Sequence, residues 1–141
     1  MARHVYRCPL RWSDMDAYQH VNNVVFLRYL EEARVDLLLN AAGEQGRAML
    51  DTGVVVARHE IDYKAPLVFR PEPVPIELWT ERIANGSFTV AYEVVDTDAA
   101  TGERTVYATA RTVLVPFDNA AGHSRRVSAD DRAWLDRFLD A

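Results

Sequence analysis

The chain has 141 residues, a formal net charge of −5 and one cysteine, Cys8. This length favours a single domain, residues 1–141, and the negative charge argues against a dedicated nucleic-acid binder. One cysteine excludes an intramolecular disulfide and the cysteine pairs of a zinc site. No apolar run suits a signal peptide or a membrane span, so we expect a cytoplasmic protein with no membrane partner.

The N-terminal part is predicted to form a strand, a loop and a long helix. Residues 4–12 form the strand and residues 13–22 the loop, and the helix runs from Asn23 to about Ala42. Either Asn22 or Asn23 is predicted to cap the helix. Apolar residues at spacings of three and four indicate this helix, at Phe26, Leu30, Ala33, Leu37 and Ala41. Further apolar positions widen this apolar face of the helix, so we expect the helix to be covered on most sides.

After the helix the pattern changes to β-strands. Gly43 is predicted to end the helix, and residues 43–53 to form a polar connector with a short helical turn. Four strands follow, indicated by β-branched residues, alternation and turn signals, at residues 54–63, 76–84, 87–96 and 104–116. Residues 117–128 are predicted to be a loop, and Ser128 to cap a short helix at 129–139.

This order of elements predicts an α+β fold. Tandem strands joined by short turns imply an antiparallel sheet, and one covered helix implies a sheet that curls round it. We therefore expect an antiparallel sheet of about five strands wrapped around one long central helix, with a short C-terminal helix added.

The loop between the first strand and the long helix concentrates polar groups. Two carboxylates, an imidazole and two side-chain amides come from Asp14, Asp16, His20, Asn22 and Asn23. Acid/base groups beside the unpaired N–H groups of a helix start are what acyl-transfer chemistry needs. Each residue also has an ordinary structural interpretation, because aspartates stabilise turns, asparagines cap helices and a histidine can be structural.

Other catalytic schemes find no support in the sequence. It has no Gly-x-Ser-x-Gly elbow and no glycine-rich phosphate loop, and its four histidines show no metal-ligand spacing. Cys8 is expected to be a small buried hydrophobic residue. We therefore expect neither a metal nor a cofactor.

The motif resembles that of a known family. Asp14-Met-Asp16, followed by Val-Asn-Asn and an apolar helix with Glu31-Glu32-Ala-Arg34, resembles the hotdog-fold thioesterases of the 4-hydroxybenzoyl-CoA thioesterase-like superfamily. The string from Arg11 to Asn23 is also similar to the matching segment of plant acyl-ACP thioesterases. The resemblance continues at residues 61–67, which match the superfamily's second-strand segment.

The resemblance implies a mechanism. The second aspartate of the pair, Asp16, would act as nucleophile or as general base toward water at the thioester carbonyl. The backbone amide of Asn23 would stabilise the developing oxyanion, because a helix N-terminus favours negative charge. His20 would assist, and Tyr18, Asn22 and Val24 are the predicted substrate-binding residues.

Two departures from the family pattern affect these roles. Bacterial relatives often carry His or Tyr seven residues after the catalytic aspartate, where this chain has Asn23. The plant enzymes place Asn where this chain has Tyr18, whereas their histidine is matched by His20. The His-Gly-Gly signature of the other thioesterase clade is missing, so Glu31 is expected to pair with Arg34 on the helix face.

We therefore predict an enzyme that hydrolyses acyl-CoA, or acyl-ACP, to a free acid and a thiol. The alternatives are a hotdog hydratase or dehydratase, which would show an Asp-x-Asn-Pro-x-His string, and a non-catalytic acyl-binding module. A homodimer or homotetramer is expected, because a single sheet leaves an exposed edge and the family pairs such edges. Candidates to contact CoA phosphates are Arg58, Lys64, Arg70, Arg82, Arg125 and Arg126.

Overall fold

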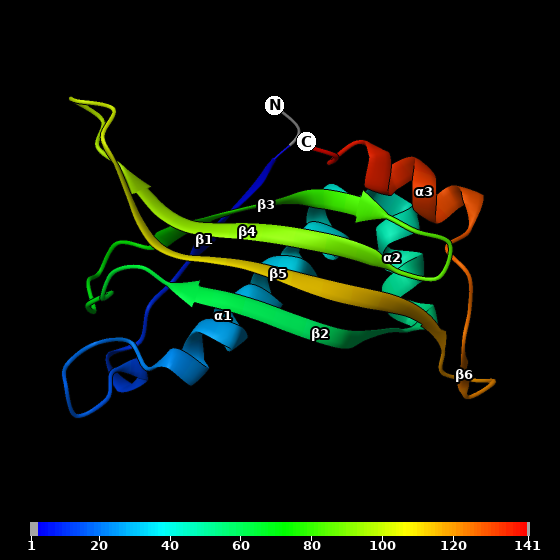
Figure 1. Cartoon of the computed structure of the whole chain (residues 1–141), viewed down its shortest axis with the longest axis horizontal. Helices are drawn as coiled ribbons and strands as arrows, with labels where there is room; N and C mark the ends of the chain where they lie inside the picture. Colours follow the sequence, from blue (N-terminus) through cyan, green and yellow to red (C-terminus); the bar gives the residue numbers. More distant parts are fainter. Residues whose placement is uncertain (1–2, 141) are drawn as a thin grey trace.

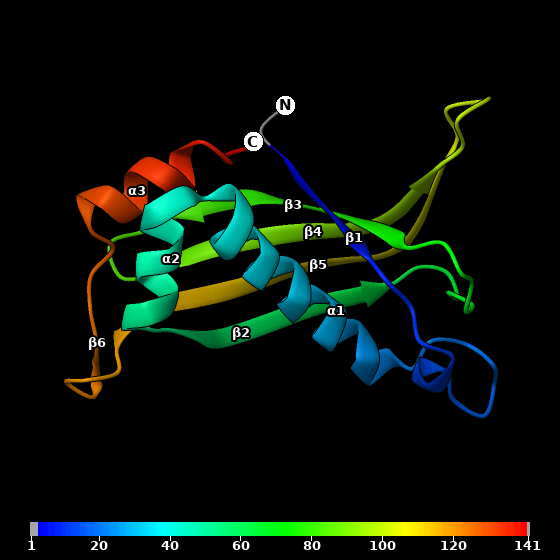
Figure 2. The same cartoon turned by 180° about the vertical axis from the view of Figure 1, so that it is seen from behind.

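A curved antiparallel sheet wraps around one long helix, α1 (Asn23–Asp36), in the computed structural model, which describes residues 3–140 (Figures 1 and 2). The main strands follow the order β1-β3-β4-β5-β2, and the short β6 pairs with the end of β5. The strands are β1 (His4–Cys8), β2 (Val54–Tyr63), β3 (Val74–Ile83), β4 (Phe88–Thr97), β5 (Arg104–Asp118) and β6 (His123–Ser124). This arrangement confirms the predicted α+β layout.

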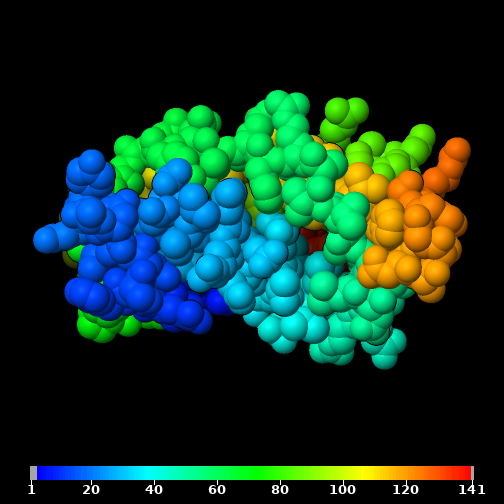
Figure 3. Space-filling view, turned by 90° about the horizontal axis from the view of Figure 1, so that it is seen from below, coloured from blue at the N-terminus to red at the C-terminus, as the bar shows by residue number. Residues whose placement is uncertain are grey.

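Helix α1 packs on the concave face of the sheet. Its buried side is apolar, with Phe26, Tyr29, Leu30 and Ala33 in the core, and residues 37–41 continue it as a π-helix. Its other side is exposed, as Figure 3 shows where α1 lies at the surface beside β2. The expectation that the helix is covered on most sides is therefore wrong for the single chain, because the curved sheet covers only one side of α1.

Most elements begin and end within a few residues of their predicted bounds, and the predicted loop 117–128 contains the short β6, but two segments differ more. The first strand ends at Cys8, not residue 12, because Pro9 has no N–H for the ladder and a short 3₁₀ turn follows at Trp12–Asp14. The predicted connector 43–53 is instead a full helix, α2 (Gly43–Thr52). Helix α2 packs closely on the end of the preceding helix, since a Cβ on Gly46 would lie 2.5 Å from the backbone oxygen of Leu38.

Strand β2 has the predicted bounds and forms one edge of the sheet. Its pairing with β5 shifts at a β-bulge between Val56 and Arg58. Val55 and Val56 are exposed on this strand. The far edge of β2 has no neighbouring strand within residues 3–140, so one side of the sheet presents unpaired backbone groups.

The core lies between the sheet and the helices. Helix α3 (Ala129–Asp136) closes one end, with Trp134 packed edge-on against Phe88, and Ser128 caps it as predicted. Cys8 is buried as expected, and burial raises the pKa of its thiol to about 12. No helix within residues 3–140 has the length and apolar character to cross a membrane.

One buried side chain in this core is an arginine, Arg34. Arg34, only 8% exposed, donates from Nη1 to the hydroxyl of Tyr92 at 3.2 Å and forms no ion pair among the described residues. The hydroxyl of Tyr92 donates to Thr112, whose hydroxyl bonds to Nδ1 of His59 at 2.9 Å. Burial, and next the charge of Arg34, lower the pKa of His59. The predicted Glu31–Arg34 pair is therefore wrong, because the guanidinium turns into the core.

Candidate active site

The loop before α1 is organised around Asp14. Its carboxylate is 6% exposed and accepts the backbone N–H of Arg11 at 3.1 Å and the hydroxyl of Tyr29 at 2.6 Å. Burial, and next this hydrogen bond, raise the pKa of Tyr29, so its hydroxyl stays a donor. Asp14 is thus occupied by structural contacts, in agreement with its structural interpretation.

Asp16 lies at the start of a tight turn. Its backbone N–H donates to the carbonyl of His20 at 2.9 Å, and the N–H of Gln19 donates back to its carbonyl at 3.0 Å. Gln19 adopts the left-handed conformation that this turn requires, with φ of 63°. The Oδ1 atom of Asp16 accepts the N–H of Tyr18, whereas Oδ2 has no hydrogen-bond donor among residues 3–140. One carboxylate oxygen is therefore held in place and the other is free.

The start of α1 leaves one backbone amide without an acceptor. Asn22 caps the helix: its Oδ1 accepts the N–H of Val24 at 2.8 Å, and its carbonyl accepts the N–H of Val25 at 3.0 Å. The N–H of Asn22 itself donates to the carbonyl of Asp14. The N–H of Asn23 has no acceptor in the described part of the chain. Such a group at a helix N-terminus favours negative charge.

A surface pocket of about 340 Å³ brings the carboxylate and the helix start together. One wall comes from the loop and α1, and includes Asp16, His20 and Asn23. The opposite wall is residues 63–67, the end of β2 and the segment that follows it. The two walls are joined because the N–H of Val21 donates to the carbonyl of Leu67 at 2.7 Å.

The predicted site residues fall into two groups. Asp16, His20 and Asn23 line the pocket, although no hydrogen bond joins the side chains of Asp16 and His20 within residues 3–140. The three predicted substrate-binding residues do not line it: Asn22 caps the helix, and Tyr18 and Val24 are 83% and 66% exposed. The chemical roles of all six residues stay predictions.

The second wall was not among the predicted site residues. Tyr63, Lys64 and Leu67 lie about forty positions after the loop in the printed sequence, and nothing in their local pattern indicates contact with it. Tyr63 lies on the helix-facing side of β2, because its ring packs edge-on against Phe26 with ring centres 5.4 Å apart. The strand ends there, so Lys64 leaves the alternation and joins the pocket.

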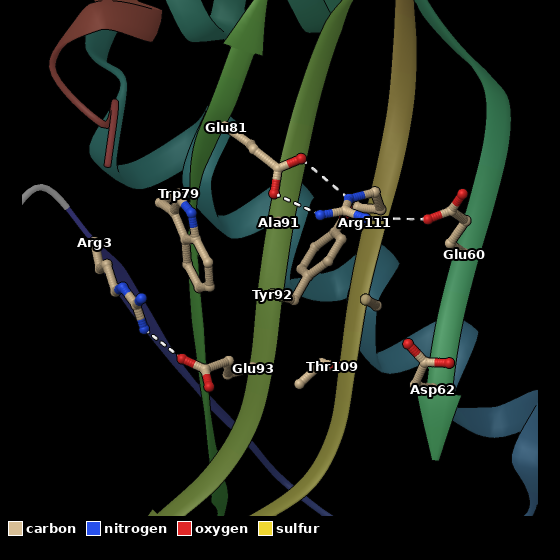
Figure 4. A pocket seen from close by; sticks show the side chains of 11 residues that line it. Arg3, Glu60, Asp62, Trp79, Glu81, Ala91, Tyr92, Glu93, Thr109 and Arg111 are labelled. Carbon is tan, nitrogen blue, oxygen red and sulfur yellow. Dashed lines mark hydrogen bonds and ion pairs between the residues drawn. The ribbon is translucent and has the colours of Figure 1, made fainter. Parts of the chain in front are cut away.

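A second hollow of about 330 Å³ lies on the face of the sheet that points away from α1 (Figure 4). Most of its charged groups pair with one another: Arg111 bonds to Glu81 and Glu60, and Arg3 to Glu93. This hollow contains neither the loop nor a helix start. No group of three or more metal-binding side chains occurs in the described part of the chain. We therefore take the pocket at Asp16 as the candidate active site.

Comparison with known proteins identifies the family. A family model described as the thioesterase-like superfamily matches residues 10–135. The long-chain acyl-CoA thioesterase FadM of Escherichia coli is 41% identical over 59 residues. That match spans less than half of either protein, 42% of this chain and 45% of FadM.

Two solved structures extend the comparison. A candidate acyl-CoA thioesterase from Xanthomonas campestris is 35% identical, with a TM-score of 0.66, and the match covers 79% of this chain and 90% of that one. A variant of 4-hydroxybenzoyl CoA thioesterase bound to 4-hydroxybenzoyl CoA is only 15% identical. Its TM-score is 0.81 over 96% of this chain and 99% of its own, so it shows the same fold.

Proposed function

Because the chain belongs to the thioesterase-like superfamily, we propose that it hydrolyses an acyl-CoA thioester to a free acid and a thiol. The observation that carries this proposal is the pocket that Asp16 and Asn23 share. Within residues 3–140, it offers a carboxylate with one oxygen that accepts no hydrogen bond and a helix amide with no acceptor. Thioester hydrolysis needs both, a base or nucleophile and a donor for the oxyanion.

Asp16 can act in two ways. As a general base it takes a proton from water, and the resulting hydroxide adds to the carbonyl carbon. As a nucleophile it adds itself, forming an anhydride that water then hydrolyses. In either route the carbonyl oxygen becomes negative and is stabilised by the N–H of Asn23, and the C–S bond then breaks. A thiol has a pKa of about 8.5, so the thiolate leaves without a dedicated acid.

His20 is the proposed assistant. It shares the pocket with Asp16, and its exposed imidazole is free of side-chain hydrogen bonds within residues 3–140. An imidazole in that position can orient the attacking water or carry its proton to solvent. It would do so only in the substrate complex, since the two side chains are not bonded here.

CoA carries phosphate charges, and the lining of the pocket shows which cation could contact them. Of the six cations singled out in the sequence, only Lys64 lines this pocket, and it has no ion-pair partner in the described part of the chain. Arg70 is bound to Asp96, and Arg125 to Asp131. Lys64 is therefore the proposed cation at the pocket for CoA. An acyl-ACP substrate would place its phosphopantetheine arm in the same pocket.

We also propose that the chain, as one domain of residues 1–141 in the cytoplasm, works as a homodimer or as a homotetramer built from two such dimers. The unpaired edge of β2 supports this, because natural proteins cover such edges. The exposed valines Val55 and Val56 lie on the same strand, and Tyr63 at its end lines the pocket. Pairing of two β2 edges would bring the pocket to the subunit boundary.

The test is a thiol-release assay over a panel of acyl-CoA esters that differ in chain length and aromaticity. We expect hydrolysis of at least one class by the native protein and a kcat lowered by about 10²–10⁴-fold in Asp16→Asn, which keeps the size of the side chain. Hydration of an enoyl-CoA without thiol release would favour the hydratase alternative. Binding of acyl-CoA without any turnover would favour the acyl-binding module.

A further inference from the structure

Tyr63, the last residue of β2, makes two contacts with the first turn of α1. Its hydroxyl donates to the backbone carbonyl of Asn23 at 2.7 Å. Its ring packs edge-on against Phe26, with ring centres 5.4 Å apart. Asn23 is also the residue whose N–H has no acceptor in the described part of the chain. The edge strand therefore touches the residue that offers the free amide.

The position of Tyr63 is itself held by β5. Tyr63 stands opposite Ala108 in the ladder, and the next two backbone N–H groups, of Lys64 and Ala65, both donate to the carbonyl of Tyr107. These contacts fix the backbone of residues 63–65, which belong to one wall of the pocket. Burial raises the pKa of the Tyr63 hydroxyl, so it remains a protonated donor at neutral pH.

We propose that Tyr63 is a positioning residue, which holds the first turn of α1 so that the amide of Asn23 faces the reacting carbonyl at a set distance from Asp16. This inference rests on the proposed thioester hydrolysis. An oxyanion donor works only within a narrow range of distance, and a displacement of about 1 Å can lower a rate by about 10²-fold. Tyr63 acts through Asn23, not on the substrate.

The contact from Tyr63 is the only side-chain hydrogen bond to the backbone of Asn23 within residues 3–140. On the other side of the helix start, the side chain of Asn22 holds Val24. The first turn is therefore held from the loop by the cap and from the sheet by Tyr63. Loss of the hydroxyl would leave the cap and the ring contact intact and remove only the hydrogen bond from Tyr63 to Asn23.

Tyr63→Phe tests this, because it removes the hydroxyl and keeps the ring against Phe26. The control is Tyr6→Phe, which removes a tyrosine hydroxyl on β1, outside the pocket. We expect Tyr63→Phe to lower kcat about 3- to 10-fold, the loss of one net hydrogen bond, with KM changed less than about twofold. The control should leave both values unchanged.

A second measurement separates this inference from the proposed activity. The amide proton resonance of Asn23, followed by NMR in the absence of substrate, should shift in Tyr63→Phe and not in Tyr6→Phe. An unchanged Asn23 resonance, an unchanged kcat, or a rise in KM alone would overturn the positioning role. A native protein that releases no thiol would instead contradict the proposed function. The shift of the Asn23 amide resonance would still show whether Tyr63 holds the helix start.

Discussion

The hydroxyl of Tyr29 in α1 donates a 2.6 Å hydrogen bond to the buried carboxylate of Asp14. Asp14 stands two residues before Asp16, so this bond ties the loop that carries Asp16 to the middle of the helix. The two aspartates of the motif therefore have separate tasks. Asp14 builds the loop, and Asp16 is free to face the pocket.

Asp14→Ala should destabilise the protein by about 2 kcal/mol, because it leaves the buried hydroxyl of Tyr29 without an acceptor. Asp16→Ala, a change in the same loop at a less buried carboxylate, should change the free energy of unfolding by less than about 0.5 kcal/mol. Urea unfolding of the two variants measures both changes in the free energy of unfolding. Equal losses would contradict the division of tasks.

Asp16→Ala should lower kcat for acyl-CoA hydrolysis by about 10²–10⁴-fold, the usual contribution of a positioned base. The fold should be retained, since Asp16 contributes only a local turn bond to the loop. Steady-state kinetics together with circular dichroism measure both properties. Near-native turnover by a folded variant would rule out the proposed mechanism.

His20→Ala should lower kcat by about 10–10⁴-fold if the imidazole orients water or moves its proton. Its exposed side chain contributes little to the core, so thermal stability should stay close to that of the native protein. The measurement is kcat beside the melting temperature. A stability loss with unchanged kcat would show a structural histidine.

Light scattering at micromolar concentration should give the mass of a dimer or of a tetramer built from two dimers. The physical reason is the open edge of β2, with Val55 and Val56 exposed along it. Dilution that dissociates the assembly should also reduce specific activity, because the pocket would lie at the subunit boundary. A monomer that retains full activity would refute this prediction.

KM for an acyl-CoA should rise between low and high salt, because screening weakens the attraction between a local cation and phosphate. KM for an acyl-pantetheine thioester without phosphates should respond much less. Lys64→Ala should remove most of the difference, since Lys64 is the proposed cation at the pocket.

The matched control is Arg58→Ala, which removes a cation that does not line the pocket and is paired with Glu60. If the two substrates respond alike to salt, there is no phosphate contact, and an acyl-ACP or an uncharged thioester becomes the better substrate.

Local signals in the sequence determined several elements directly. The start of α1, the bounds of β2 and the cap at Ser128 were predicted and are observed, and the cap of α1 is Asn22, one of the two predicted candidates. Each depends on residues within a few positions of one another, where side-chain chemistry and periodicity act on the backbone. The family motif likewise lies in one continuous loop, so Asp16, His20 and Asn23 could be singled out together.

Tertiary packing decided the rest. Helix α2 contains two glycines, which are unfavourable inside a helix, but Met49 is buried in the core and Gly46 allows close approach to the preceding helix. The turn of Arg34 toward Tyr92 and the contact of Tyr63 with Asn23 join residues 58 and 40 positions apart. Local pattern cannot encode such contacts, because their free energy arises only when the sheet curls round α1.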